Sequence, residues 1–458
     1  LSTAAGLELA DTVAVAAGIS GGSSAADSGK SLVGVLGVLG GAACHLALGT
    51  TYCWGNFLPY LPPHLRFFDG LSHPGVQPDA LWVLPGAFIF QMLTMPFGPW
   101  FQARIGCRMT TLLGCWLMSL GVFLAASAPN LTVFMLCYSA LFGAGVGIAY
   151  TAPMVNGWRW FPKRRGLVSG AVVAGFGAGG FIFNQVGSKL ANPTSINSVA
   201  GSYPPAIYAA FPVMLRKLAL FYAVLTGFGA FLVRPPSAAA GAGPAGKGGK
   251  PAAIAVAAGG KGYTVREALK SPTFYLLWAM ALGIGISGIN TANVYKAYGS
   301  TIESLRQVAA SDSFQALVGS LGALFNGGGR LFWGNVLDAV GFRRPFALLA
   351  ALQAAAMALY PVVARTKVGF AAATCTILFC LGGNFAMFPA VSTRIFGADN
   401  GAAIYGCLFS AFATASIGGT FLTKALQARF GWAGVFRVMS ALSVVVLAVL
   451  GTLGGGLP

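Results

Sequence analysis

Twelve apolar segments recur along this chain of 458 residues, and they constrain its fold more than any other feature. A transmembrane helix needs about 20 mostly apolar residues, because the hydrocarbon core is about 30 Å thick and a helix rises about 1.5 Å per residue. Only 8% of the residues are charged, whereas soluble domains carry about 25%. The sequence therefore predicts an all-α integral membrane protein with twelve transmembrane helices. We expect the spans at 32–59, 80–101, 109–127, 131–155, 165–188, 212–233, 272–295, 313–333, 345–363, 369–390, 402–424 and 433–453.

The longest gap between apolar segments divides the spans into two sets of six. It contains the stretch PPSAAAGAGPAGKGGKP, whose low complexity is typical of a flexible linker. A segment rich in Ala, Gly and Ser precedes the first span and resembles a flexible tail. The expected units are a tail at 1–30, a six-helix bundle at 31–233, a cytoplasmic linker at 234–270 and a second bundle at 271–458.

The two halves repeat a short motif at equivalent places. The second span of the first half ends in ARIGCR, Ala103 to Arg108, and its counterpart in the second half ends in DAVGFR, Asp338 to Arg343. A duplicated six-span unit with a substrate site between the copies is a known transporter plan. The sequence therefore predicts two pseudo-symmetric six-helix bundles with the site between them.

Basic residues in short loops indicate the orientation in the membrane. The loop after the fourth span carries Arg159, Lys163, Arg164 and Arg165, and the linker is also basic. Since cytoplasmic loops are enriched in Lys and Arg, we expect the linker and both termini in the cytoplasm. The net charge of +18 is dispersed between apolar segments, so we expect a lipid bilayer as partner and no nucleic acid. The spans fit a plasma membrane and an organelle membrane equally well.

Arg330 stands inside an otherwise apolar span. A charge at the centre of the bilayer costs about 2.5–3.5 kcal/mol or more, so such a residue usually faces a watery cavity or a partner. The chain has ten acids, and all of them lie in tails, loops or span ends: Glu8, Asp11, Asp27, Asp69, Asp79, Glu267, Glu303, Asp312, Asp338 and Asp399. No acid therefore lies inside a span to pair with Arg330. Since a guanidinium binds a carboxylate through two parallel hydrogen bonds, we expect the partner of Arg330 to be an anionic substrate. The alternative is that Arg330 reaches the membrane surface or a backbone carbonyl.

The same distribution of acids disfavours catalysis and cofactor binding. Paired-carboxylate chemistry and most metal sites need acids that converge in one place. The eight cysteines form no C-x-x-C pair and no cluster with histidine. We therefore expect no enzyme activity, no metal and no cofactor. We also expect transport that needs no proton gradient, because a carboxylate inside a span is the usual proton carrier.

Other polar and aromatic residues have helical spacing that could direct them into a cavity beside Arg330. Residues seven apart share one face of a helix, as do residues three or four apart. The candidate lining residues are His45, Tyr52, Tyr150, Asn290, Asn293, Tyr405, Phe409 and Phe412. The competing interpretation is that each one packs in the core or makes an interhelical hydrogen bond.

The chain resembles the major facilitator superfamily, and within it the oxalate/formate antiporters and the monocarboxylate transporters. The matching stretches include GTTYCWGNF from Gly49, WFPKRRGLVSGAVVAGFGAGG from Trp160 and NGGGRLFWGNVLDAVGFRR from Asn326. The resemblance implies that Arg330 is the anion-binding arginine of the eighth span. It places Phe412 where the oxalate antiporter has a lysine, and Asn326 where proton-coupled relatives have an acid.

These features together predict a transporter that moves a small monocarboxylate, such as pyruvate, lactate or formate, by alternating access. Arg108, Asp338 and Arg343 are expected to control gating, and the protein is expected to be a monomer. One alternative is an oxalate/formate exchanger with a second cation supplied by Lys296. Another is a sensor that uses a transporter scaffold without transport.

Overall fold

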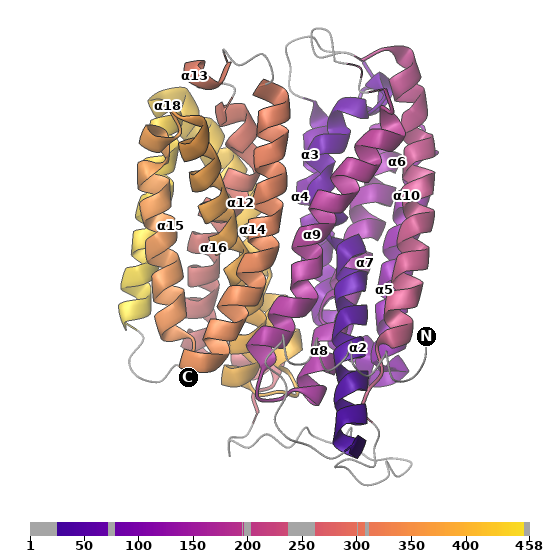
Figure 1. The fold of residues 1–458 in the computed structure, drawn as a ribbon, viewed down its shortest axis with the longest axis vertical. Coiled ribbons are helices and arrows are strands. Elements are labelled where there is room, and N and C mark those ends of the chain that lie inside the picture. Colours follow the sequence, from indigo (N-terminus) through magenta and orange to yellow (C-terminus); the bar gives the residue numbers. More distant parts are fainter. Residues whose placement is uncertain are drawn as a thin grey trace.

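The computed structural model describes residues 25–71, 78–194, 196, 203–236, 262–299, 301–306 and 311–452, and every regular element in these ranges is helical. Figure 1 shows two helical bundles side by side, with the first half of the chain in indigo to pink and the second half in orange to yellow. Both ends of the linker lie at the lower end of this view, which we call the linker face and define by residues 236 and 262.

The first bundle consists of α2 (Ala25–Leu48), α3 (Trp54–Phe57), α4 (Val83–Thr94), α5 (Gly98–Ala125), α6 (Leu131–Met135), α7 (Phe142–Tyr150), α8 (Ala152–Trp160), α9 (Arg165–Ala191) and α10 (Pro205–Leu232), with short 3-10 and π-helical turns between some of them. The second half consists of α11 (Val265–Ala268), α12 (Pro272–Gly299), α13 (Glu303–Arg306), α14 (Ser311–Val340), α15 (Arg343–Val363), α16 (Lys367–Phe396), α17 (Gly401–Leu408) and α18 (Ser410–Thr452).

The described helices confirm the expected architecture of twelve spans. Ten helical stretches are long and apolar enough to cross a membrane. One of them, Asp79–Ala125, has 47 residues and comprises two spans, because it bends at Gly106. The 30-residue α14, which carries Arg330, is not among the ten and adds the twelfth. The protein is therefore an all-α membrane protein.

Each repeated motif contains a glycine with positive φ. Gly106 and Gly341, which occupy the same place in ARIGCR and DAVGFR, both have φ of 79°. A side chain with a Cβ rarely adopts this conformation, so glycine turns the chain there at little steric cost. Gly431, with φ of 62°, bends α18 between the last two spans in the same way. The repeat seen in the sequence is thus also a repeat of backbone geometry.

Three boundaries differ from those expected. Helix α2 already begins at Ala25, inside the segment expected to be a tail, while residues 1–24 lie outside the described part. Helix α10 begins at Pro205, where proline is well suited to the first turn. Helix α11 lies within the expected linker, since Thr264 and Glu267 form a capping box that starts a helix. Residues 237–261 of the linker lie outside the described residues.

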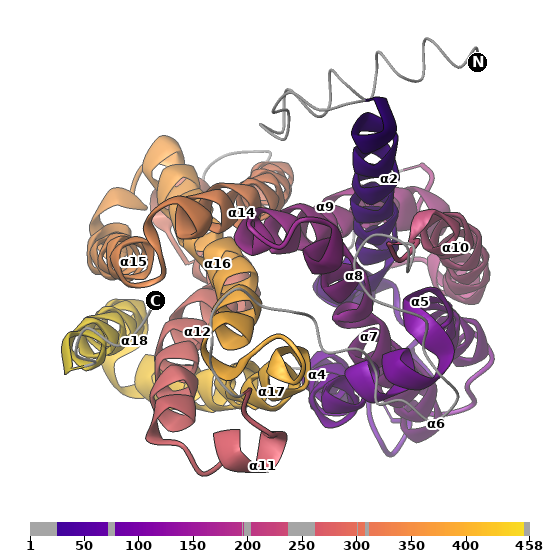
Figure 2. The ribbon, with the colours of Figure 1, turned by 90° about the horizontal axis from the view of Figure 1, so that it is seen from below.

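Helices α9 and α14 make the closest contact between the two halves (Figure 2). The face of α9 that meets α14 carries Gly166, Gly170 and Gly177. A Cβ added to Gly170 would overlap the backbone oxygen of Arg330, and one added to Gly177 would lie 2.9 Å from Oδ1 of Asn326. Small residues allow membrane helices to approach closely. This glycine face therefore brings the backbone of α9 within reach of the Arg330 side chain.

The positive-inside rule predicts that the linker face is cytoplasmic. A cysteine introduced by Ser237→Cys should react with a membrane-impermeant maleimide only after intact cells are permeabilised. The matched control is Leu71→Cys, an exposed position in the loop between the first two spans, which should react in intact cells. Labelling of the Ser237→Cys variant from outside, with no labelling of Leu71→Cys, would reverse the orientation.

Candidate functional site

Arg330 is completely buried between the two bundles, with 0% of its surface exposed. Its Nε donates a hydrogen bond to Oδ1 of Asn326, one turn earlier on α14, at 3.0 Å. Its Nη1 donates to the backbone oxygen of Val173 on α9 at 2.9 Å. The side chain thus joins the two halves through neutral acceptors, and none of these contacts cancels its charge.

The guanidinium retains donors that these two bonds do not use. It has five N–H groups, of which the contacts with Asn326 and Val173 take two. Nη2 is buried and has no hydrogen-bond partner among the described residues. A buried donor without an acceptor costs about 1–3 kcal/mol, and more when it is charged. An acceptor from a ligand would therefore be bound favourably at Nη2.

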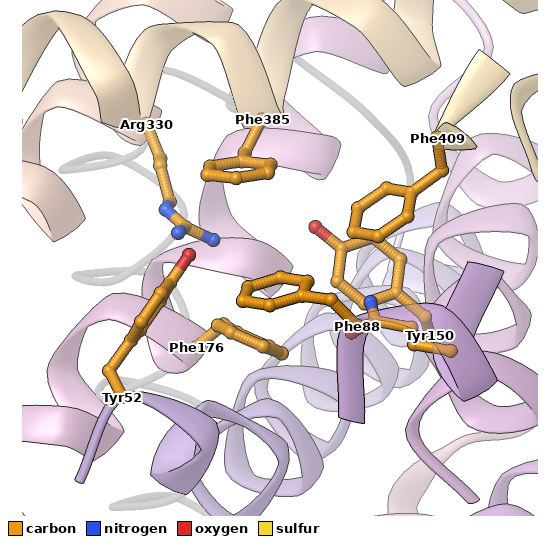
Figure 3. A pocket seen from close by; sticks show the side chains of 8 residues that line it. Tyr52, Phe88, Tyr150, Phe176, Arg330, Phe385 and Phe409 are labelled. Atoms are coloured by element: carbon orange, nitrogen blue, oxygen red, sulfur yellow. The ribbon is translucent and has the colours of Figure 1, made fainter. Parts of the chain in front are cut away.

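A narrow, closely packed pocket lies beside the guanidinium (Figure 3). Five of its lining residues come from the first half and three from the second. They are Tyr52, Phe88, Gln91, Tyr150 and Phe176, together with Arg330, Phe385 and Phe409. The pocket therefore lies at the junction of the two bundles, where substrates bind in transporters built from repeated halves.

Aromatic rings make up most of the pocket wall. The guanidinium carbon of Arg330 lies 5.5 Å from the ring centroid of Phe176 and 4.9 Å from that of Phe385. Phe88 and Phe409 stack across the junction of the halves, with their centroids 6.4 Å apart. Rings stabilise the cation by cation–π attraction, while their low polarity strengthens its attraction for an anion.

The structure brings four of the residues expected at the site together around this pocket. Arg330, Tyr52, Tyr150 and Phe409 all line it. In Figure 3 the hydroxyl oxygen of Tyr52 points toward the guanidinium. The helical faces inferred from spacing in the first, fourth, eighth and eleventh spans therefore converge.

Three further expected residues form a second layer behind the pocket wall. The ring of His45 lies 5.2 Å from that of Tyr150, and the ring of Tyr405 lies 6.4 Å from it. Phe412 packs against Phe385 with 5.0 Å between centroids. These residues contact the lining residues and are not themselves part of the wall.

The asparagines of α12 lie apart from the pocket. Asn290 donates from Nδ2 to Oγ1 of Thr423 at 2.6 Å, which is an interhelical hydrogen bond within the second bundle. Asn293 is exposed. The side chain of Lys296, considered as a second cation, lies outside the described residues.

Four lining residues were not expected from the sequence: Phe88, Gln91, Phe176 and Phe385. Gln91 could have been identified from the sequence, because it is the only amide in the apolar stretch VLPGAFIFQMLT. The three phenylalanines could not, since the chain has 34 phenylalanines and apolar helices use them for packing against lipid as well as protein.

Asp338 joins the two halves near the linker face. Its carboxylate accepts hydrogen bonds from the backbone N–H groups of Gly166 and Leu167 at 2.9 and 2.8 Å, at the start of α9. It also forms an ion pair with Arg394 of α16. An acid at a helix N-terminus stabilises its unpaired N–H groups and its dipole. This contact holds the halves together on one side of the pocket.

The other two residues expected to control gating lie elsewhere. Arg108 places its guanidinium carbon 4.7 Å from the ring centroid of Phe231, within the first bundle. Arg343 is exposed at the start of α15. Neither shares the contact that Asp338 makes with α9.

The described residues contain no group of three or more His, Cys, Asp or Glu side chains that could hold a metal ion. The residues lining the pocket include one permanent cation, one amide and two phenol groups, with no carboxylate. This set of groups can bind and orient a small anion through hydrogen bonds.

Comparison with known proteins identifies similar transporters, although no protein-family model matches the chain. The chain is 30% identical to the apicoplast pyruvate carrier 1 of Toxoplasma gondii, and the match covers 91% of this chain and 89% of that protein. It is also 30% identical to the oxalate:formate antiporter of Oxalobacter formigenes, with 79% of each chain covered.

Solved structures show the same architecture. The proton:xylose symporter XylE superimposes with a TM-score of 0.66 at 14% identity, over 93% of this chain and 96% of that one. The transporter FucP, in its outward conformation, gives a TM-score of 0.60 at 16% identity, over 90% of this chain and 97% of that one. These likenesses show the fold, while the two relatives at 30% identity show the family. The chain therefore belongs to the major facilitator superfamily, as a multi-pass membrane transporter of the monocarboxylate and oxalate–formate type.

Proposed function

We propose that this transporter moves a small monocarboxylate by alternating access and that Arg330 binds the carboxylate. The observation that carries the proposal is the unpartnered Nη2 of a fully buried arginine beside a pocket between the two halves. A carboxylate oxygen at Nη2 would satisfy the donor and neutralise the charge. Both effects would make binding favourable in an aromatic pocket of low polarity.

The charge of the pocket supports a monoanion as substrate. Arg330 is the one cation among the lining residues, and a monocarboxylate would bring the local charge to zero. Phe412, which the family resemblance places at the position of a lysine in the oxalate antiporter, packs in the second layer and adds no charge. The likeness to a pyruvate carrier points in the same direction.

Exchange of oxalate for formate is the second candidate, and the likeness to the oxalate:formate antiporter favours it. Oxalate is a dianion, so its binding to a single arginine would leave one negative charge uncompensated in a pocket of low polarity. Counterflow measurements with labelled pyruvate and labelled oxalate in proteoliposomes distinguish the two candidates. Faster exchange of oxalate than of pyruvate would favour the antiporter.

Alternating access fits the contacts around the pocket. Asp338 joins the start of α9 to α14 and α16 on the linker side of Arg330. We infer that these contacts close this side when substrate can enter from the other. They must separate for release, and the two hydrogen bonds and one ion pair are interactions that can form again in each cycle.

The contacts of Arg330 predict that lysine cannot replace it. Two of its nitrogens donate to different partners while the third, Nη2, is free to bind the substrate, whereas a lysine ammonium has one nitrogen and cannot form a two-pronged contact. Pyruvate at 100 times its dissociation constant should stabilise the wild type by about 2.7 kcal/mol. The Arg330→Lys and Arg330→Gln variants should show little stabilisation and no pyruvate flux, as measured by thermal unfolding and by transport in proteoliposomes.

The matched control is Arg343→Gln, which removes an exposed arginine thirteen residues later on the next helix. It should keep the ligand-induced rise in melting temperature. Equal stabilisation of the Arg330→Gln variant and the wild type would assign Arg330 a structural role and place the substrate elsewhere.

The absence of an acid from the pocket predicts exchange that needs no proton gradient, and Asn326 allows this to be tested. Its Oδ1 accepts from Arg330, while its Nδ2 donates to the backbone oxygen of Leu378 at 3.0 Å. In Asn326→Asp, an ionised carboxylate would neutralise Arg330 and compete with the substrate. A protonated carboxyl group would again donate a hydrogen bond to the backbone oxygen of Leu378 and would leave the positive charge of Arg330 uncompensated.

Pyruvate affinity of Asn326→Asp should therefore rise as pH falls, whereas the affinity of the wild type should change little above the pKa of pyruvate. Equilibrium binding between pH 5 and pH 8 measures both proteins. Uphill uptake by the wild type that is driven by a pH gradient alone would contradict the proposed exchange, and His45 would then be the first group to replace.

A further inference from the structure

We propose that Gln91 recognises an oxygen on the second carbon of the substrate, so that the transporter selects 2-oxo and 2-hydroxy monocarboxylates over carboxylates without that oxygen. This inference rests on the proposed role of Arg330 and names the substrate class for the same pocket. It assigns to the first half of the chain a contact that complements the carboxylate contact of the second half.

Gln91 is a buried polar group whose hydrogen bonding is incomplete. It lies on α4 with 1% of its surface exposed, and its Nε2 has no hydrogen-bond partner among the described residues. An amide nitrogen carries two N–H donors, and a buried donor without an acceptor is costly. The unpaired donor of Gln91 is therefore unfavourable for the stability of the protein, and a ligand that accepts its hydrogen bond would remove this penalty.

The two incomplete donors of the pocket come from opposite halves of the molecule. Gln91 belongs to α4 of the first bundle and Arg330 to α14 of the second, and both line the same pocket. Nε2 of Gln91 and Nη2 of Arg330 each lack an acceptor. A small anion with acceptor oxygens on two adjacent carbons would offer one acceptor to each donor and would so link the two halves.

The other lining groups do not demand such a ligand. Phe88, Phe176, Phe385 and Phe409 offer aromatic surface. The hydroxyl groups of Tyr52 and Tyr150 can either donate or accept, so they adapt to a carboxylate or to a hydroxyl group. The Nε2 group of Gln91 can only donate, which favours a carbonyl or hydroxyl oxygen beside the carboxylate. Formate and acetate have no such oxygen.

Pyruvate and propionate provide the direct comparison, because both are three-carbon monoanions and only pyruvate has an oxygen at the second carbon. A pocket built to hydrogen-bond a substrate oxygen discriminates strongly against an analogue that lacks it. For a single neutral donor we expect wild-type protein to prefer pyruvate by about tenfold or more in competition for labelled pyruvate exchange. Lactate should compete better than propionate.

Gln91→Leu replaces the amide by an apolar side chain of similar size. This variant should transport propionate at least as well as the wild type and should lose most of the preference for pyruvate. The matched control is Gln102→Leu on α5. Gln102 is also buried, and its amide atoms also lack partners, yet it does not line the pocket. It should keep the wild-type preference.

Several results would overturn the proposal. A wild-type protein that does not distinguish pyruvate from propionate has no recognition of the second-carbon oxygen, and this measurement requires no variant. If the Gln91→Leu protein keeps the preference for pyruvate, another group provides the selectivity. If it loses transport of both substrates equally, Gln91 has a structural role. If Gln91→Leu fails to insert, Gln91→Met serves for the same comparison. Failure of the wild type to exchange either carboxylate would contradict the proposed function itself.

Discussion

The permanent charge of Arg330, buried between two helical bundles, is the constraint on which the rest of the site depends. In hydrocarbon such a charge is unfavourable unless donors and acceptors surround it. The chain supplies an amide from α14, a carbonyl from α9 and two aromatic faces, and none of these neutralises the guanidinium. Nη2 has no partner among the described residues, and Arg330 lines the pocket, so a bound anion would supply the missing acceptor.

The glycine face of α9 makes this arrangement possible. Val173 can reach Arg330 only because Gly170 and Gly177 let the backbones of α9 and α14 approach without intervening side chains. The same pair of helices carries the contact of Asp338 with the start of α9. Under the proposed mechanism, substrate binding and closure of the linker side would both depend on this one interface. A change in the separation of α9 and α14 would alter both the carbonyl contact of Arg330 and the Asp338 contact together.

The features that could be predicted from the sequence are those that follow from the free-energy cost of placing polar or charged groups in the membrane. Hydrophobic length revealed the spans, and the cost of an unpaired charge singled out Arg330. Which other residues reach the pocket depends on how the helices pack against one another. Asn290 and Gln91 are both lone amides in apolar helices, yet Asn290 pairs with Thr423 in its own bundle while Gln91 lines the pocket. Phe385 lines it because α16 packs against α14, and no local pattern encodes that packing.

A structure determined with saturating pyruvate would test the central claim most directly. The account predicts a carboxylate oxygen within about 2.7–3.2 Å of Nη2 of Arg330, with the ligand held between the aromatic rings of both bundles. The contacts of Arg330 with Asn326 and Val173 should either persist or be exchanged for a second carboxylate contact. Pyruvate bound at another place, with Nη2 occupied by water or by a protein group, would contradict the account.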